Sequence, residues 1–256
     1  MSAKEIEYDL EQTLDVRWAS RPIKIHIQRT PKHKYSYQIT SERRERQPVG
    51  EGSNLPSVTT IGGCIAHDGF GAGVGWAQWL IGQHKGDVAA AERASKQTMQ
   101  RGTDIHNVID KFIKVRDMPE ENDDAFMSWH REIGSQHMWV ASEMLVVDTT
   151  LEIGGTIDAI SVENGSYVIW DWKTKDRNSR GTFHKDPKDK AQIAAYARAL
   201  HRINHQFTPQ KAYICYIMRD GSGIEVVDVD LTKACKLFDI GHSMYHALRN
   251  AKGSGS

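Results

Sequence analysis

The sequence lacks closely spaced cysteines, long apolar runs and an excess of charge of one sign. Its three cysteines, Cys64, Cys215 and Cys235, are far apart and include no CxxC pair, so we expect no disulfide framework and a reducing compartment. No apolar run approaches the roughly 20 residues that cross a membrane. The acidic N-terminal stretch has neither the apolar core of a signal peptide nor the acidic-poor character of a transit peptide. We therefore expect a cytoplasmic protein without a membrane partner.

Positive charge is unevenly distributed, although 33 Lys and Arg residues balance 33 Asp and Glu residues. A first basic run contains Arg21, Lys24, Arg29, Lys32, Lys34, Arg43, Arg44 and Arg46, against only Glu42 and Glu45. A second run contains Lys175, Arg177, Arg180, Lys185, Lys188 and Lys190. Either run alone is typical of a solvated surface. Beside a hydrolytic carboxylate cluster, contact with the phosphates of a nucleic acid becomes the better interpretation.

Periodicity predicts an α/β protein with a layered core. A β-hairpin with a basic outer face is expected at 23–27 and 35–39, because isoleucine or tyrosine alternates with polar residues there. Helices are expected within 75–116, 123–141, 187–203 and 231–248, and strands at 143–149, 155–162, 167–173, 212–219 and 224–229. The glycine-rich stretch 62–75 has no GxxxxGK[ST] pattern, which argues against a nucleotide-phosphate loop.

Two of these strands carry aspartates in apolar surroundings. Asp158 follows Ile157 in one strand, and Asp171 lies between Trp170 and Trp172 in the next. A strand sends alternate side chains to opposite faces, so Asp171 and Lys173 share a face. Buried carboxylates on neighbouring strands repel each other unless a cation lies between them. The pattern therefore predicts a divalent metal site with a lysine beside it, which suits phosphodiester hydrolysis.

Several other polar residues are weak evidence for a functional site when each is taken alone. His106 lies on the apolar stripe of its helix, one turn after Gly102, and alone would be a core histidine. Glu143 alone would be an exposed charge at the start of a strand. Gln192 and Tyr196 are four apart on a helix and alone would be ordinary packed residues. The pairs His201 with His205 and His242 with His246 have a zinc-compatible spacing, but neither has an obvious third ligand.

Taken together, these positions resemble the PD-(D/E)xK nuclease superfamily, and within it the RecB-type exonucleases. The resemblance rests on five elements in order: Gly102 with His106, Glu143, Gly155 with Asp158, Asp171 with Lys173, and Gln192 with Tyr196. Ile157 replaces the proline of the family pattern. The segment 55–59, with a hairpin ahead of it, looks most like the branch of the mitochondrial genome-maintenance exonuclease and its phage relatives. The three scattered cysteines exclude the iron–sulfur cluster of another branch, and no helicase motif is present.

The resemblance implies a restriction-endonuclease-like core, a mixed central sheet flanked by helices, preceded by the hairpin and a helical segment. It implies one or two Mg²⁺ or Mn²⁺ ions held by Asp158, Asp171, His106, Glu143 and the backbone carbonyl of Trp172. It makes Lys173, Asp171, Asp158 and Glu143 the catalytic residues. Gln192, Tyr196, Lys175, Lys24, Arg43 and Arg44 become candidates for DNA contact, with Trp170, Trp172 and Tyr196 as stacking or packing aromatics.

The expected activity is hydrolysis of DNA, preferably at single-stranded ends, in replication, recombination or repair, with proteins of those processes as possible partners. If the chain is phage-encoded, its compartment is the host cytoplasm. A structure-specific endonuclease, a double-strand exonuclease and a non-cleaving nucleic-acid-binding module are the alternatives. We expect an N-terminal hairpin and basic loop at 1–55, a nuclease domain at 56–252 and a linker or tag remnant at 253–256.

Overall fold

Two sheets organise the chain in the computed structural model, which describes residues 8–18, 21–41, 50–65, 80–120, 123–203 and 207–253. The N-terminal sheet is antiparallel, in the order β1 (Leu10–Trp18), β2 (Arg21–Arg29), β3 (Tyr35–Ser41), β4 (Gly50–Leu55). The central sheet has the order β5 (Met138–Asp148), β6 (Ile153–Glu163), β7 (Ser166–Lys175), β8 (Lys211–Met218), β9 (Ile224–Asp228). It is mixed, because β7 and β8 are parallel while the other pairs are antiparallel. The mixed sheet expected from the sequence is thus confirmed.

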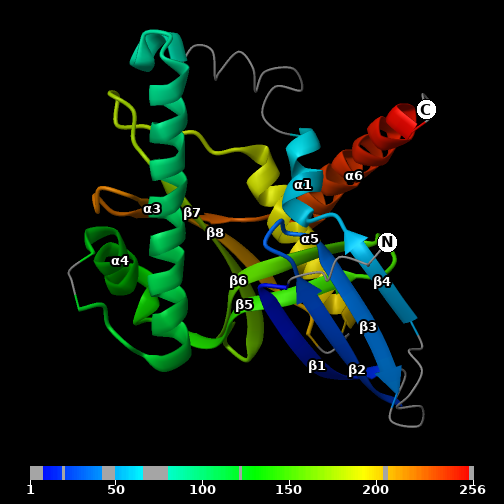
Figure 1. Cartoon of the computed structure of the whole chain (residues 1–256). Helices are drawn as coiled ribbons and strands as arrows, with labels where there is room; N and C mark the ends of the chain where they lie inside the picture. Colours follow the sequence, from blue (N-terminus) through cyan, green and yellow to red (C-terminus); the bar gives the residue numbers. More distant parts are fainter. Residues whose placement is uncertain are drawn as a thin grey trace.

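Helices cover both faces of the central sheet (Figure 1). On one side lie α3 (Val88–Val115), α4 (Asp124–Trp129) and a π-helical turn (His130–Gly134). On the other side lie α5 (Pro187–Ile203), α6 (Leu231–Gly253), the short α1 (Val58–Gly62) with a 3-10 turn (Gly63–Ile65), and the N-terminal sheet. The described helices include none that is long and apolar enough to cross a membrane.

The N-terminal region differs from the expected hairpin. The predicted strands are β2 and β3, but β1 and β4 flank them, so the hairpin is the inner pair of a four-stranded sheet. β1 was missed because polar and charged residues, including Gln12 on the apolar side, mask its alternation, and β4 because it lies in a stretch rich in glycine and charge. The division of the chain into domains at residue 55 stays a prediction, but β2 and β3 contribute Ile25, Ile27 and Tyr35 to the same apolar cluster as β5 and α5.

Two helix predictions were too long. The helix predicted at 123–141 ends with the π-helical turn, where the ring of Trp129 leaves no room for a side chain at Gly134. β5 begins at Met138, and the strand therefore includes five residues before Glu143. Within 75–116 the described helix is not continuous: residues 80–84 are helical, and α3 begins separately at Val88. The two segments are divided where Gly86 has a φ of 83° and Asp87 caps α3 by accepting a hydrogen bond from the Ala90 N–H.

An aromatic cluster fills the space between the central sheet and α3 and α4. Its members are Phe112, Phe126, Trp129, Trp139, Trp170 and Trp172, with ring centroids of neighbouring pairs less than 6 Å apart. Trp170 and Trp172 are each 2% exposed, and Trp170 donates its indole N–H to Ser161 Oγ at 2.8 Å. They cannot stack on DNA bases in this arrangement. Their packing fixes β7 so that Asp171 and Lys173 face the opposite side.

Candidate metal centre

Three acidic side chains lie side by side across the first three strands of the central sheet. The β5–β6 register pairs Ser142 with Ala159 and Met144 with Ile157, so Glu143 lies opposite Asp158. The β6–β7 register pairs Ala159 with Trp170 and, continued by one residue, brings Asp158 beside Asp171. Local alternation thus supplies the face, and strand pairing supplies the neighbours. The sequence led us to expect Glu143 at the start of a strand. It lies instead in the middle of β5.

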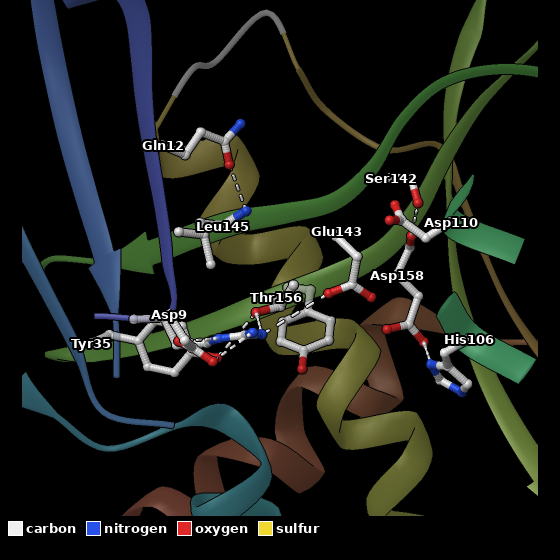
Figure 2. A network of polar contacts seen from close by, with 12 residues as sticks. Asp9, Gln12, Tyr35, His106, Asp110, Ser142, Glu143, Leu145, Thr156 and Asp158 are labelled. Atoms are coloured by element: carbon white, nitrogen blue, oxygen red, sulfur yellow. Dashed lines mark hydrogen bonds and ion pairs between the residues drawn. The ribbon is translucent and has the colours of Figure 1, made fainter. Parts of the chain in front are cut away.

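His106, Glu143 and Asp158 form a group of possible ligands. One ligand atom from each lies within 4.8 Å of the others, and the described residues contain no other such set of three. His106 Nδ1 lies 3.9 Å from Asp158 Oδ2. Glu143 and Asp158 extend from neighbouring strands, and His106 approaches Asp158 from α3 (Figure 2). Each of the three is partly exposed, so an ion from solvent has access.

Asp171 is oriented differently from that group. Its side chain is fully buried, and its Oδ2 lies 2.5 Å from Lys173 Nζ, a contact that forms an ion pair. Neither of its carboxylate oxygens has a well-directed hydrogen bond within the described chain. Asp158 Oδ2 instead accepts the Trp172 backbone N–H at 2.7 Å. The two aspartates therefore meet around one peptide unit of β7, where Lys173 contacts Asp171 Oδ2 and Oδ1 is buried without a partner among the described residues.

Burial shifts the pKa values of this cluster. It raises the pKa of Asp171 to about 7, against the opposing effect of Lys173, and it raises the pKa of Asp158 as well. Burial also raises the pKa of Glu143 to about 7, with the charge of Asp158 adding to the effect. The pKa of His106 falls to about 4, chiefly through burial and then through the charge of Lys173. Three carboxyls that resist ionisation together, beside a neutral imidazole, are the state expected before a cation binds.

Lys173 keeps its charge in these surroundings. Burial lowers its pKa, but Asp171, Asp158 and Asp189 together outweigh burial, and the resulting pKa lies above the ordinary value. Asp189 is 2% exposed and accepts a hydrogen bond from the Tyr216 hydroxyl at 3.2 Å. Because β7 and β8 are parallel with Lys173 opposite Tyr216, this acid lies next to the lysine. No pattern in the sequence singles out Asp189.

Two glycines let neighbouring elements approach the acidic strands closely. A Cβ at Gly155 would lie 2.3 Å from Tyr196 Cε1, and one at Gly102 would lie 2.8 Å from Thr174 Oγ1. Tyr196 is 3% exposed, and its hydroxyl accepts a hydrogen bond from Gln192 Nε2 at 2.8 Å. Gln192 and Tyr196 are therefore close to the site, but the tyrosine ring packs against β6 instead of facing solvent.

The candidate DNA-contact lysines occupy different places. Lys175 follows Lys173 on the same face of β7 and is partly buried, with its Nζ 5.7 Å from the centroid of the Tyr216 ring. Lys24 is exposed on the outer face of β2, since Ile23 and Ile25 point inward. The structure brings Lys175, but not Lys24, to the face that carries the acids. Arg43 and Arg44 lie outside the described residues.

A second polar group reaches Glu143 from the N-terminal sheet. Arg29 Nη1 lies 4.0 Å from Glu143 Oε2 and donates to Thr156 Oγ1 at 3.3 Å. Asp9 holds the same guanidinium through two hydrogen bonds of 3.1 Å. In the sequence, Arg29 stands out only as one member of a basic run. The signal for its role was its position two residues after Ile27, on the inward-facing side of β2.

Among the described residues, the pair His242 and His246 does not form a comparable centre. His242 Nε2 lies 3.2 Å from the Leu151 carbonyl oxygen and 3.1 Å from His246 Nε2. In the described part of the chain, no third His, Cys, Asp or Glu ligand atom completes a site with them. His205 of the other pair lies outside the described residues.

The residues at the acidic strands fit a divalent cation. Carboxylate oxygens with one imidazole nitrogen are ligands that Mg²⁺ and Mn²⁺ accept, and the buried Oδ1 of Asp171, which has no partner among the described residues, provides further acceptor capacity. Bringing three acids together on one sheet face, one of them fully buried, is costly unless positive charge compensates them. Lys173 supplies one such charge beside Asp171, and Arg29 supplies another near Glu143.

Comparison with known proteins agrees with this geometry. The model of the PD-(D/E)XK nuclease superfamily matches residues 114–237, a range that includes the acids on β5, β6 and β7 and Lys173 but not His106 or the N-terminal sheet. With the mixed sheet and its helices, the match confirms the expected fold class and supports the superfamily. No curated protein matches the sequence significantly. A crystal structure of a protein named SSO0001 aligns with 14% identity and a TM-score of 0.35 over 78% of this chain and 80% of that one.

Proposed function

We propose that this chain is a Mg²⁺- or Mn²⁺-dependent exonuclease that hydrolyses DNA. The match to the PD-(D/E)XK nuclease superfamily model supports this proposal. The superfamily suggests metal-dependent nuclease activity and a nucleic acid substrate. The observation that carries the proposal is the row of Glu143, Asp158 and Asp171 across three neighbouring strands, with Lys173 beside Asp171. A protein that only bound DNA would gain nothing from these costly buried acids.

The metal ligands in this proposal are Asp158, Asp171, His106, Glu143 and the backbone carbonyl of Trp172. A divalent ion held there would lower the pKa of a bound water and polarise the phosphate. To bind the ion, Asp171 would have to share its carboxylate between the metal and Lys173. Its buried oxygens have no other partner among the described residues. His106 would bind the metal as a neutral imidazole, because its lowered pKa leaves a nitrogen lone pair available at pH 7.

Lys173 is the proposed electrophilic group. It stays protonated because the surrounding acids raise its pKa, so its ammonium group can orient the attacking water or stabilise negative charge that develops on the phosphate. Gln192 and Tyr196 would position the DNA strand near the metal, the tyrosine mainly by supporting Gly155 from behind. Lys175 would contact the backbone phosphates next to the site, and Lys24, Arg43 and Arg44 more distant ones.

Within this function, we propose cleavage at single-stranded ends by a RecB-type enzyme like the mitochondrial genome-maintenance exonuclease and its phage relatives. The support is the five-element motif pattern and the basic runs. A role in replication, recombination or repair in the cytoplasm, or in the host cytoplasm for a phage protein, follows from that likeness. The competing functions are a structure-specific endonuclease, a double-strand exonuclease and a module that binds nucleic acid without cutting it.

One gel experiment tests these functions. Labelled linear and circular DNA, single- and double-stranded, is incubated with the wild type and with Asp171→Asn, each with Mg²⁺, with Mn²⁺ and with EDTA. We expect metal-dependent shortening of linear single strands by the wild type only. Cleavage of circular single strands would show an endonuclease, preference for duplex ends would show a double-strand exonuclease, and DNA binding without cleavage by the wild type would refute the enzyme.

A further inference from the structure

The N-terminal sheet places a cation behind the metal centre. Strand alternation on β2 carries Ile23, Ile25, Ile27 and then Arg29 to the inner face, where the three isoleucines are buried. The Arg29 side chain is only 17% exposed. An arginine in an apolar row is costly to bury unless its donors are satisfied by acceptors. Here the acceptors come from both sheets, so Arg29 links them.

The guanidinium is held from two sides. Asp9 accepts from Nε and Nη2 at 3.1 Å each, a bidentate geometry that fixes the plane of the group. Nη1 points the other way, toward Thr156 Oγ1 at 3.3 Å and Glu143 Oε2 at 4.0 Å. Thr156 also hydrogen-bonds the Tyr35 hydroxyl at 3.2 Å. Figure 2 shows Asp9, Tyr35 and Thr156 on one side of Glu143, and Asp158 and His106 on the other.

Glu143 needs external support because its own backbone is irregular. Its φ is 49°, in the left-handed region that is unfavourable for residues other than glycine. Gln12 of β1 supports the same segment, since its side-chain oxygen accepts the Leu145 backbone N–H at 2.7 Å. The strand segment that presents Glu143 is therefore held by the N-terminal sheet through both a backbone and a side-chain contact.

We propose that Arg29 is a positioning residue that directs the Glu143 carboxylate toward the metal ligands Asp158 and His106. The N-terminal sheet then contributes to the metal centre, although the region matched by the superfamily model begins after it. The inference rests on the proposed function in that it assumes a metal at this site. Residues that orient metal ligands through hydrogen bonds typically change metal affinity or activity by 10- to 100-fold when replaced.

The test measures Mn²⁺ binding by calorimetry without DNA. Arg29→Met removes the charge and keeps the aliphatic stem, and we expect about 10-fold weaker Mn²⁺ binding. Arg29→Lys keeps the charge but not the forked contacts, and should recover part of the affinity. The control is Gln28→Ala, which removes a 2.8 Å contact with Glu11 on the outer face of the same strand and should bind Mn²⁺ like the wild type.

A double-mutant cycle separates positioning from general stabilisation. If Arg29 acts through Glu143, Arg29→Met in a Glu143→Gln background should weaken Mn²⁺ binding by less than about 2-fold further. Unchanged affinity in Arg29→Met, or an additive loss in the double variant, would overturn the proposal. Should Arg29→Met fail to fold, Asp9→Asn releases the guanidinium from its more exposed side and is expected to weaken binding several-fold, with unchanged affinity again counting against the proposal.

This experiment can fail independently of the proposed function. A wild type that binds Mn²⁺ without cutting DNA refutes the nuclease but leaves the role of Arg29 to be decided by calorimetry. A wild type that cuts DNA while Arg29→Met binds Mn²⁺ normally refutes only the positioning role. An effect confined to the KM for DNA would instead identify Arg29 as a phosphate contact and would also overturn it.

Discussion

The buried carboxyl of Asp171 should make the metal-free protein less stable as the pH rises. Its pKa is about 7 in the folded protein, against the ordinary value of 3.8 expected after unfolding. Between these values the folded chain holds a proton that the unfolded chain releases, so the free energy of unfolding falls with rising pH. The contribution is complete below pH ~4 and lost above pH ~7, and three pKa units correspond to at most about 4 kcal/mol.

The assay is urea unfolding of EDTA-treated protein between pH 4 and 8, for the wild type and for Asp171→Asn. The difference between the two is needed because His106 has the opposite sign: its pKa falls from 6.5 to about 4, so its contribution increases stability as the pH rises through that window. We expect the stability of the wild type, relative to the variant, to fall by about 2–4 kcal/mol from pH 4 to pH 7.

Two further observations belong to the same experiment. Mn²⁺ at pH 8 should raise the stability of the wild type, because a ligand that binds only the folded state stabilises it, and should stabilise Asp171→Asn much less. Asp228→Asn, at an exposed position on β9, is the matched control and should follow the wild type. Parallel stability curves for the wild type and Asp171→Asn would refute the reasoning that burial of this carboxyl governs the site.

Three other substitutions give separate tests. Gly155→Ala should destabilise the protein by about 1–3 kcal/mol in chemical unfolding, because the new Cβ meets the ring of Tyr196 at 2.3 Å; an unchanged midpoint would show that the ring can move aside. Lys173→Met should lower kcat for DNA cleavage by about 100-fold or more while Mn²⁺ binding persists, and equal loss of both would contradict its role as an electrophile. Tyr216→Phe removes the hydrogen bond to buried Asp189 and should cost about 1–3 kcal/mol of stability, which thermal unfolding would detect.

The site residues that the sequence did identify depend on local patterns. The shared face of Asp171 and Lys173 follows from strand alternation alone, and the strands predicted at 155–162 and 167–173 were expected to be neighbours. The structure agrees on both points. The aromatic side of β7 was predictable for the same reason, because Trp170 and Trp172 have the opposite parity.

Element boundaries and the N-terminal sheet were harder to predict. In β1 the polar Gln12 interrupts the alternation between Leu10 and Leu14, and the strand is recognised mainly by its nine paired positions along β2. Helix ends near Gly86 and Gly134 depend on a positive φ and on the ring of Trp129, respectively. The position of Glu143 within β5 depends on where that strand begins, which pairing with β6 decides.

By itself, the sequence determined the order of the elements of the central sheet and its helices, the faces of their strands and a compact set of candidate residues, because these follow from the alternation of the backbone over a few residues. Only the tertiary structure decided which groups touch. It turned Asp171 toward Lys173, packed Tyr196 against Gly155 and brought Arg29 to Glu143 across 114 positions of chain. Such contacts are set by the packing of distant elements around one core, and no periodicity in a single sequence encodes them.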